Sequence, residues 1–337
     1  MANNQGITNT ELLKVLELPK TIIDDLKTKQ GTQFQAVANE FLDALFNKVI
    51  YQTVVSMDEF ENPFKKYDGF PIAYGDTIEN AFVELPKGYK YDMEATDPFT
   101  RKMPSVKALY ATINYEMQYE TTIYDAQLRK AVLSEYGFMS MIDNILGALQ
   151  KAKSMDEYFA TICMLNNADI MANGIEKLEY ESTATAKDKA ELVAKTIVDT
   201  TSKMTMPLKT NNKLGVMTVS AKDNLCLVIK RTLLNDVNLD YLTGVFNLSK
   251  VELIKNIIQV ETFQTEQDNN GVITTVGEDI DFMVIDTKGF DNHVALEDGG
   301  MIYNPKGKYT NHFYNLWKII SFKYFYNARA FKLSVKA

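Results

Sequence analysis

The chain has two histidines, His293 and His312, and histidine is the side chain that most often moves protons near neutral pH. A catalytic histidine needs an orienting partner, and a metal-binding histidine needs further ligands at a suitable spacing. Neither histidine has a second His, a Cys or a carboxylate at metal-ligand spacing in the sequence. We therefore expect a structural or surface role for both.

Paired carboxylates could serve a different chemistry, the hydrolysis of glycosidic bonds. Nothing in the sequence singles out one acid for a raised pKa, and runs of charge usually form solvated faces. We therefore interpret these clusters as surface features. They are Asp24-Asp25, Asp58-Glu59-Glu61 and Glu278-Asp279-Asp281.

The segment Asp268-Asn269-Asn270-Gly271 has the composition of a calcium-binding loop. An EF-hand loop needs Glu at its twelfth position, and counting from Asp268 that position is Asp279. A loop or hairpin turn is therefore the simpler interpretation. The chain also lacks a P-loop, a G-x-G-x-x-G and a G-x-S-x-G motif. We expect no catalytic site, no cofactor and no metal, which favours a structural protein over an enzyme.

Composition favours a folded chain that does not bind nucleic acid tightly. Of its 337 residues 46% are hydrophobic, enough for a packed core. The net charge of −8 argues against tight binding of nucleic acid, which needs a basic field. The start of the chain lacks a signal peptide and no apolar run approaches about 18 residues, so we expect a protein made in the cytoplasm. Cys163 and Cys226 are expected to be buried, reduced thiols.

The elements that would position these residues begin with a helical arm. Thr32–Ile50 carries apolar residues at i, i+3, i+4 and i+7, which is typical of an amphipathic helix. Its stripe includes Phe34, Phe41, Leu45 and Phe46. We expect this stripe to dock on a neighbouring molecule.

The most regular pattern is the alternation over Leu109–Ile123, which predicts a strand with one buried face. Such a strand would be ~48 Å long, whereas ordinary strands span roughly 17–20 Å. Together with Ala81–Leu85 and the polar stretch Pro86–Pro104, it predicts an extended hairpin with a wide, mixed-charge tip. The apolar face then needs cover from outside its own domain, and another copy of the chain is the simplest source.

The remaining segments mix helices and strands without regular alternation, which favours the α+β class. Gly137–Ala168 is expected to form one long helix or two in series, with a helix start at Ser154–Glu157. Further helices are expected at Lys187–Met206 and Leu233–Phe246. The expected strands are Gly215–Val219, Leu225–Ile229, Ile257–Phe263, Ile280–Ile285 and strands buried on both faces within Met301–Val335, with Gln264–Gly271 as a polar loop.

Taken in order, several segments resemble one family. They are Gly75–Leu85 (GDTIENAFVEL), Tyr115–Ile123 (YEMQYETTI), Ala126–Val132 (AQLRKAV), the Phe138–Tyr158 helices, Asp240–Asn247 (DYLTGVFN), Trp317–Ser321 (WKIIS) and Tyr326-Asn327-Ala328. The chain resembles the major capsid (head) proteins of tailed bacteriophages, particularly those of short-tailed phages of Gram-positive bacteria. The similarity covers roughly Asp76–Ala330.

The resemblance implies the tailed-phage major capsid fold. Residues 1–69 would form the N-terminal helical arm and 70–123 the E-loop, an extended hairpin. Residues 124–181 would hold the peripheral domain with its long spine helix, 182–290 the axial domain, and 291–337 the return strands of the peripheral domain. Some shells of this fold crosslink through an E-loop lysine, but no feature marks Lys87, Lys90 or Lys102 as reactive.

The resemblance also implies a function: self-assembly into the icosahedral head that encloses the double-stranded DNA of a tailed phage. The partners would be copies of the chain itself, in pentamers and hexamers, and the resemblance also admits scaffolding and portal proteins. The DNA would be enclosed without specific binding and no membrane would be involved. The protein would be located in the virion after synthesis in the host bacterial cytoplasm.

The expected contacts between subunits lie on the E-loop and the arm. Tyr119→Asp is expected to block assembly while leaving the subunit folded. The E-loop contacts are Lys87, Tyr89, Lys90, Tyr91, Asp92, Phe99, Arg101, Tyr115, Met117 and Tyr119, and the arm contacts are Phe34, Phe41, Leu45 and Phe46.

Two alternatives stay open. An encapsulin-like protein nanocompartment has the same fold and a different cargo. A carbohydrate-binding or carbohydrate-active surface protein would instead use Tyr-rich surfaces to stack on sugars.

Overall fold

The computed structural model places helices and sheets in two compact units, described separately below. Unit 1 comprises Met1–Asn62, Tyr115–Glu157 and Leu296–Trp317, and unit 2 comprises Pro63–Asn114, Tyr158–Ala295 and Lys318–Ala337. Both helices and strands occur, in irregular order, which confirms the α+β class. The structure describes residues 19, 21–29, 33–41, 61–73, 75–86, 88, 90, 101, 103–133, 137–236, 257–269 and 272–336.

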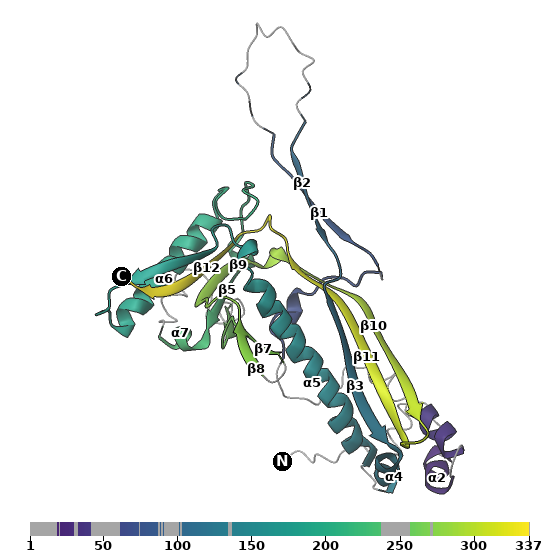
Figure 1. Cartoon of the computed structure of the whole chain (residues 1–337). Coiled ribbons are helices and arrows are strands. Elements are labelled where there is room, and N and C mark those ends of the chain that lie inside the picture. Colours follow the sequence, from purple (N-terminus) through teal and green to yellow (C-terminus); the bar gives the residue numbers. More distant parts are fainter. Residues whose placement is uncertain are drawn as a thin grey trace. The chain divides into compact units, whose positions relative to one another are not determined.

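A five-stranded mixed sheet forms the centre of unit 2 (Figure 1). Its order is β4 (Ile175–Tyr180), β12 (Ala328–Val335), β9 (Phe282–Asp286), β5 (Leu225–Lys230) and β6 (Ile257–Val260). β12 runs parallel to β4 and antiparallel to β9, while β5 runs antiparallel to β9 and parallel to β6. The expected strands at Leu225–Ile229, Ile257–Phe263 and Ile280–Ile285 are confirmed in position, whereas β4 was not anticipated.

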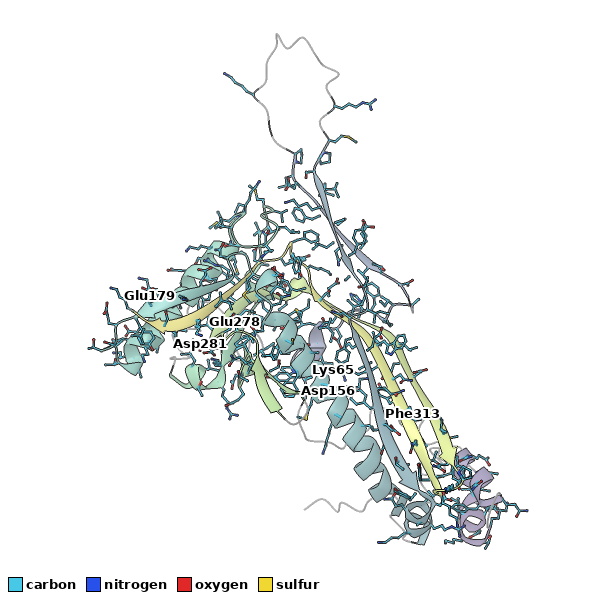
Figure 2. The ribbon with its side chains drawn as sticks, viewed as in Figure 1. Lys65, Asp156, Glu179, Glu278, Asp281 and Phe313 are labelled. Atoms are coloured by element: carbon cyan, nitrogen blue, oxygen red, sulfur yellow. The ribbon has the colours of Figure 1, made fainter. Side chains whose placement is uncertain are left out.

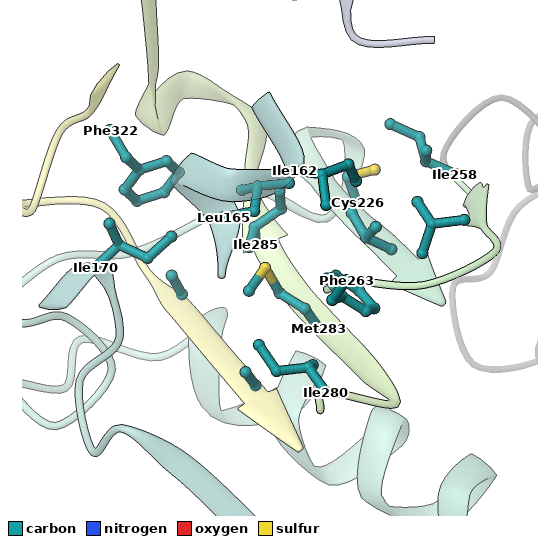
Figure 3. Close-up of a cluster of buried hydrophobic side chains, with 14 of the residues drawn as sticks. Ile162, Leu165, Ile170, Cys226, Ile258, Phe263, Ile280, Met283, Ile285 and Phe322 are labelled. Carbon is teal, nitrogen blue, oxygen red and sulfur yellow. The ribbon is translucent and has the colours of Figure 1, made fainter. Parts of the chain in front are cut away.

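Both faces of this sheet are buried, which explains the unbroken apolar runs in its strands. On one face Cys226, Val228, Met283 and Ile285 pack with Ile162 and other residues of a large cluster (Figure 3). Alternate residues of the same strands enter a second cluster on the other face, beneath α6 (Ala186–Met204). The second cluster includes Val193, Ile197, Leu227, Ile229, Phe282, Val284 and Phe331.

α6 follows the expected helix closely. Its N-terminus is a capping box, in which the Thr185 hydroxyl accepts from the Asp188 N–H and the Asp188 carboxylate accepts from the Thr185 N–H. These bonds lower the pKa of Asp188. Its buried residues recur at helical spacing, so one stripe covers the sheet.

The main sheet of unit 1 has the order β10 (Phe290–Asn304), β11 (Tyr309–Phe322) and β3 (Tyr115–Tyr124). β10 and β11 continue into unit 2, as does α5 (Gly137–Leu165), a single long helix. Unit 1 also contains α2 (Thr21–Thr28), a helix at 33–41 and α4 (Asp125–Leu133). α5 confirms the expectation of one long helix, but Ser154–Glu157 lies inside it rather than at a start.

The long strand expected over Leu109–Ile123 is wrong in one respect. The chain forms β2 (Val106–Ala111) and β3, with a break at 112–114. β2 pairs with β1 (Ile78–Val83) in a separate two-stranded sheet, while β3 joins β11. The hairpin is therefore present, but its second arm ends at Ala111.

Several shorter expectations are corrected. Gly215–Val219 is not a strand. The Asn212 Nδ2 donates to the Val216 carbonyl and the Val216 N–H donates to the Asn212 Oδ1, and these two bonds hold the segment as a turn. Gln264–Gly271 is not a plain loop, since β7 (Thr265–Asn269) pairs with β8 (Val272–Val276). Strand β11 alternates between buried and half-buried residues, so most of it is buried on one face only. Short helices occur at Lys65–Tyr67, Ala168–Ile170, Lys222–Asn224, Arg231–Asp236 (α7) and Thr287–Gly289.

Of the two cysteines expected to be buried, Cys226 confirms the expectation and Cys163 does not. Cys226 is buried, and this burial raises the pKa of its thiol to about 11. Cys163 is exposed on α5. Among the described residues, no helix is long and apolar enough to cross a membrane.

Candidate assembly interface

The β1–β2 hairpin is a two-stranded ribbon (Figure 1), and its two faces differ in burial. The antiparallel register places Ile78 opposite Ala111 and Val83 opposite Val106. Directly opposed residues point to the same face, so the alternation assigns each residue to one side. Within the described part of the chain, β1 and β2 pair only with each other.

The inner face of the ribbon is half-buried by the rest of unit 2. The Phe82 ring stacks on Phe325 with 5.6 Å between centroids. The Lys107 ammonium donates to the Leu214 carbonyl at 2.7 Å and lies 3.7 Å from the Glu84 carboxylate. Leu109 and Ala111, expected to need cover from another subunit, belong to this inner face.

The opposite side of the ribbon, here called the outer face, is exposed. Its residues are mostly small or apolar and follow both strands toward the tip, where Leu85 is 74% exposed and Met103 88% exposed. An isolated two-stranded ribbon is marginal in water, and an open apolar strand face invites a partner. The outer face consists of Glu79, Ala81, Val83, Val106, Ala108 and Tyr110.

The chain entering the hairpin is attached to β10. The Gly69 N–H donates to the Asn292 carbonyl at 2.7 Å, and the Ile72 N–H donates to the Val294 carbonyl at 2.9 Å. A Cβ at position 69 would lie 2.5 Å from the His293 ring, so this close approach requires glycine. Just before it, the Asp68 carboxylate pairs with the Lys318 ammonium at 3.0 Å, and Lys318 is only 3% exposed.

Both histidines are buried. His293 is buried, with Nε2 3.1 Å from the Asp291 carboxylate and Nδ1 2.8 Å from the Phe70 carbonyl. Sequence reasoning missed the Asp291 partner, although a carboxylate two residues away on a strand shares the histidine's face. His312 is also buried, and desolvation lowers its pKa to about 4.

The E-loop residues expected to contact a neighbour divide into three groups. Lys90 and Arg101 are described and exposed, and Met117 on β3 is exposed as well. Tyr115 and Tyr119 are covered within unit 1. The others, Lys87, Tyr89, Tyr91, Asp92 and Phe99, lie outside the described residues.

Residues of the same chain cover the Tyr115 and Tyr119 side of β3. This corrects the expectation that a neighbouring subunit covers it. Tyr115 is 7% exposed, and its hydroxyl lies 3.1 Å from the Tyr119 hydroxyl. Burial raises the pKa of Tyr115 to about 12 and also raises that of Tyr119, with Asp156 of α5 (labelled in Figure 2) contributing to both. The Lys153 ammonium of α5 bonds both Glu297 and Tyr314, at 2.8 Å each. Helix α5 therefore covers this face at Tyr115 and Tyr119, while Met117 stays exposed.

The arm residues Phe34 and Phe41 are also buried within unit 1. The Arg129 guanidinium of α4 lies 4.0 Å from the centroid of the Phe34 ring, and its Nη2 donates to the Lys29 carbonyl at 3.4 Å. The described part of the stripe therefore packs on its own chain, contrary to the expectation of docking on a neighbour. Leu45 and Phe46 lie outside the described residues.

The acidic cluster at 278–281 forms ion pairs with lysines. The Lys230 ammonium lies 2.5 Å from Asp279 and 2.9 Å from Asp281, which is labelled in Figure 2. The hydrogen bond from Lys230 lowers the pKa of Asp279, and Lys332 approaches the same carboxylate at 3.6 Å. Two carboxylates that share a lysine are ion-pair partners rather than an acid and a base for hydrolysis. Among the described residues, no group of three or more His, Cys, Asp or Glu side chains could hold a metal.

Comparison with known proteins places these features in one family. The family model for the Phi29-like phage major capsid protein matches residues 17–332. The major capsid protein of Bacillus phage B103 is 29% identical over 302 residues, covering 88% of this chain and 64% of that protein. The major capsid protein of Streptococcus phage Cp-1 is 27% identical over 309 residues, covering 87% of this chain and 82% of that protein. The chain thus spans 64% of the length of its B103 relative.

Solved structures share the fold. The capsid structure of Staphylococcus phage Andhra superposes with a TM-score of 0.59 at 11% identity, covering 86% of this chain and 92% of that one. The mature capsid of bacteriophage PhiM1 superposes with a TM-score of 0.56 at 11% identity, covering 84% and 90%. At this identity the likeness shows that the fold is that of tailed-phage capsid proteins.

Proposed function

Because the chain belongs to the Phi29-like phage major capsid protein family, we propose that its copies assemble into the icosahedral head enclosing the double-stranded DNA of a tailed phage. The observation that supports this most strongly is the outer face of the β1–β2 hairpin. It is a mostly small and apolar ribbon face, with Glu79 and Tyr110 at its base, that the rest of unit 2 leaves exposed. In a closed shell every subunit has neighbouring copies, and one of them can cover this face.

The outer face can contribute useful but limited free energy at each contact. Burying a valine- or leucine-sized side chain yields about 1.5–3 kcal/mol, and part of this is lost to ordering on association. A single hairpin contact would therefore be weak and reversible. Repetition over a closed shell makes such contacts collectively stable.

Residues at the hairpin tip would complete the contact. Lys90 and Arg101 are exposed and can set the register of docking through charge. Tyr89, Tyr91 and Phe99 remain proposed anchors, because aromatic side chains dominate interface hot spots. Lys87 and Asp92 remain proposed charged contacts. Of the residues 70–123 expected to form the E-loop, we propose that the part ending with β2 at Ala111 does so.

The proposed role is structural rather than enzymatic. A net charge of −8 suits a container that encloses DNA without gripping the phosphates, since tight binding would hinder packing and release. Pentamers and hexamers of the chain would form the shell, with scaffolding and portal proteins as further partners. The protein would be made in the bacterial cytoplasm and located in the virion.

Size-exclusion chromatography with negative-stain microscopy tests this function. The purified protein, alone and with a co-expressed scaffolding protein, should yield closed particles of uniform diameter. Only monodisperse monomers under both conditions and across a wide range of salt would overturn the proposal. Particles purified from infected cells should contain DNA, whereas a packaged enzyme in its place would indicate a nanocompartment.

A further inference from the structure

A single buried carboxylate links the hairpin to the body of unit 2. Asp291 is 2% exposed on β10. Its Oδ2 accepts from the Asn80 amide of β1 at 2.5 Å. Its Oδ1 lies 3.1 Å from His293 Nε2 and 3.1 Å from the Lys323 ammonium. Three chain segments therefore converge on one side chain: the hairpin, β10 itself and the turn between β11 and β12.

His293 extends this network to the start of the hairpin. Its Nδ1 lies 2.8 Å from the Phe70 carbonyl, and Gly69 packs directly under its ring. Asp291 is itself braced, because its backbone carbonyl accepts from the Ser321 hydroxyl at 3.3 Å. The same pair of side chains, Asp291 and His293, thus holds both the entering segment and β1.

The charges in this network belong to the body of unit 2 and not to the hairpin. Asp291 is paired with Lys323, and the nearby Lys318 ammonium is paired with Asp68. Within the described residues of the hairpin, the contribution to this network is the neutral amide of Asn80. Loss of that amide therefore leaves the carboxylate with its basic partners, so the hairpin can be detached without stranding a buried charge.

We propose that Asp291 is the positioning residue of the hairpin, holding Asn80 so that the outer face is already oriented in the free subunit. The value of this orientation rests on the proposed function, because a preorganised interface loses less entropy when a neighbour docks. The Phe82–Phe325 stack and the Lys107–Leu214 hydrogen bond also hold the inner face of the hairpin on the rest of unit 2. Asp291 differs from them in also holding the entering segment, through His293.

Amide hydrogen exchange on the full-length, unassembled protein tests the proposal. Asn80→Asp would place two carboxylates at hydrogen-bond distance, and the amides of the β1–β2 ladder should then exchange at least about tenfold faster. Asn80→Ala should have a smaller effect of the same sign. Glu79→Gln, a change on the outer face of the same strand, should leave the ladder unchanged. Amides of β5 and β9 should keep their protection in every variant.

The swapped pair provides the decisive control. In Asn80→Asp/Asp291→Asn, the amide and the carboxylate exchange places, and the ladder should regain most of its protection. Ladder protection that is unchanged in Asn80→Asp, or no better in the double variant than in Asn80→Asp alone, would overturn the positioning role. The readout needs no particles, so failure of the proposed shell function would leave these exchange rates as predicted.

Discussion

Asn114 and Ile320 form a reciprocal pair, in which the Asn114 side-chain amide makes the two hydrogen bonds to Ile320 that the backbone of a neighbouring strand would otherwise make. The Asn114 Nδ2 donates to the Ile320 carbonyl at 2.9 Å, and the Ile320 N–H donates to the Asn114 Oδ1 at 2.9 Å. The Asn114 N–H adds a bond to the Lys318 carbonyl at 3.3 Å. The amide thus continues the hydrogen-bonding of β11 at the point where the chain leaves the hairpin.

Removal of this amide should loosen the end of the hairpin. We expect Asn114→Ala to lower the free energy of unfolding by about 1–2 kcal/mol, since two side-chain bonds to strand backbone are lost. Urea unfolding followed by circular dichroism measures the change. Thr112→Ala, at an exposed position in the same break, serves as the control. Equal effects of the two substitutions would contradict the role of the amide.

The same pair explains why sequence alone misplaced the strand. The alternation over 109–123 does continue through the break, since residues 109, 111, 113, 115 and 123 are all buried or half-buried. The break depends on an amide whose partner lies 206 residues away, which no local pattern reveals. Periodicity therefore predicted the face of most residues, with Met117 as an exposed exception, but not the pairing of the strands.

The outer face should be required for assembly but not for folding. Val106→Glu places a charge opposite Val83 on an exposed position, so unfolding should change by less than about 0.5 kcal/mol. Particle yield in sedimentation velocity should fall at least about tenfold, because a desolvated charge weakens every hairpin contact. Val335→Glu, at an exposed valine of β12, is the matched control. Normal particles from Val106→Glu would show that the outer face stays uncovered.

Tyr119→Asp, which the sequence suggested for the same purpose, is no longer a clean test. The Tyr119 hydroxyl lies beside that of Tyr115 and close to Asp156, so a carboxylate there would be partly buried near another acid. We expect loss of the folded subunit rather than a selective loss of assembly. Thermal unfolding followed by near-UV circular dichroism should show a lower midpoint. An unchanged midpoint would contradict the cover by α5.

The buried pair of Asp68 and Lys318 should matter for stability. Asp68→Ala removes the carboxylate from an ammonium that is 3% exposed, which should cost roughly 3 kcal/mol of unfolding free energy. Chemical denaturation at pH 7 measures this. Asp169→Ala breaks an exposed ion pair with Lys213 and should cost less than about 1 kcal/mol. Similar costs for the two substitutions would contradict the importance of burial.

His312 should make the protein sensitive to acid. Its pKa is lowered to about 4 in the folded protein from the usual 6.5, so the unfolded chain binds the proton first as the pH falls. Above about pH 6.5 His312 is neutral in both states and does not affect the free energy of unfolding. Between about pH 6.5 and pH 4 it lowers this free energy by at most about 1.4 kcal/mol per pH unit. His312→Phe should flatten this slope in urea unfolding at pH 4.5 to 7. Identical slopes would exclude His312 as the cause.

The site was harder to predict than the core. Apolar runs located β5, β6 and β9 of the central sheet because burial on both faces leaves a clear local signal, whereas the edge strand β4 was missed. The arm stripe and the face of Tyr115 were recognised as apolar, yet pattern alone cannot tell own-chain cover from cover by a neighbour. The attachment of the hairpin depends on Asn80 and Asp291, which are 211 residues apart.

Cryo-electron microscopy of the particles tests the central claim most directly. We expect a closed icosahedral shell in which another copy covers the outer face of each hairpin, with Val83 and Val106 excluded from solvent. A failure to form closed particles, or a shell in which these two valines face solvent, would contradict the account.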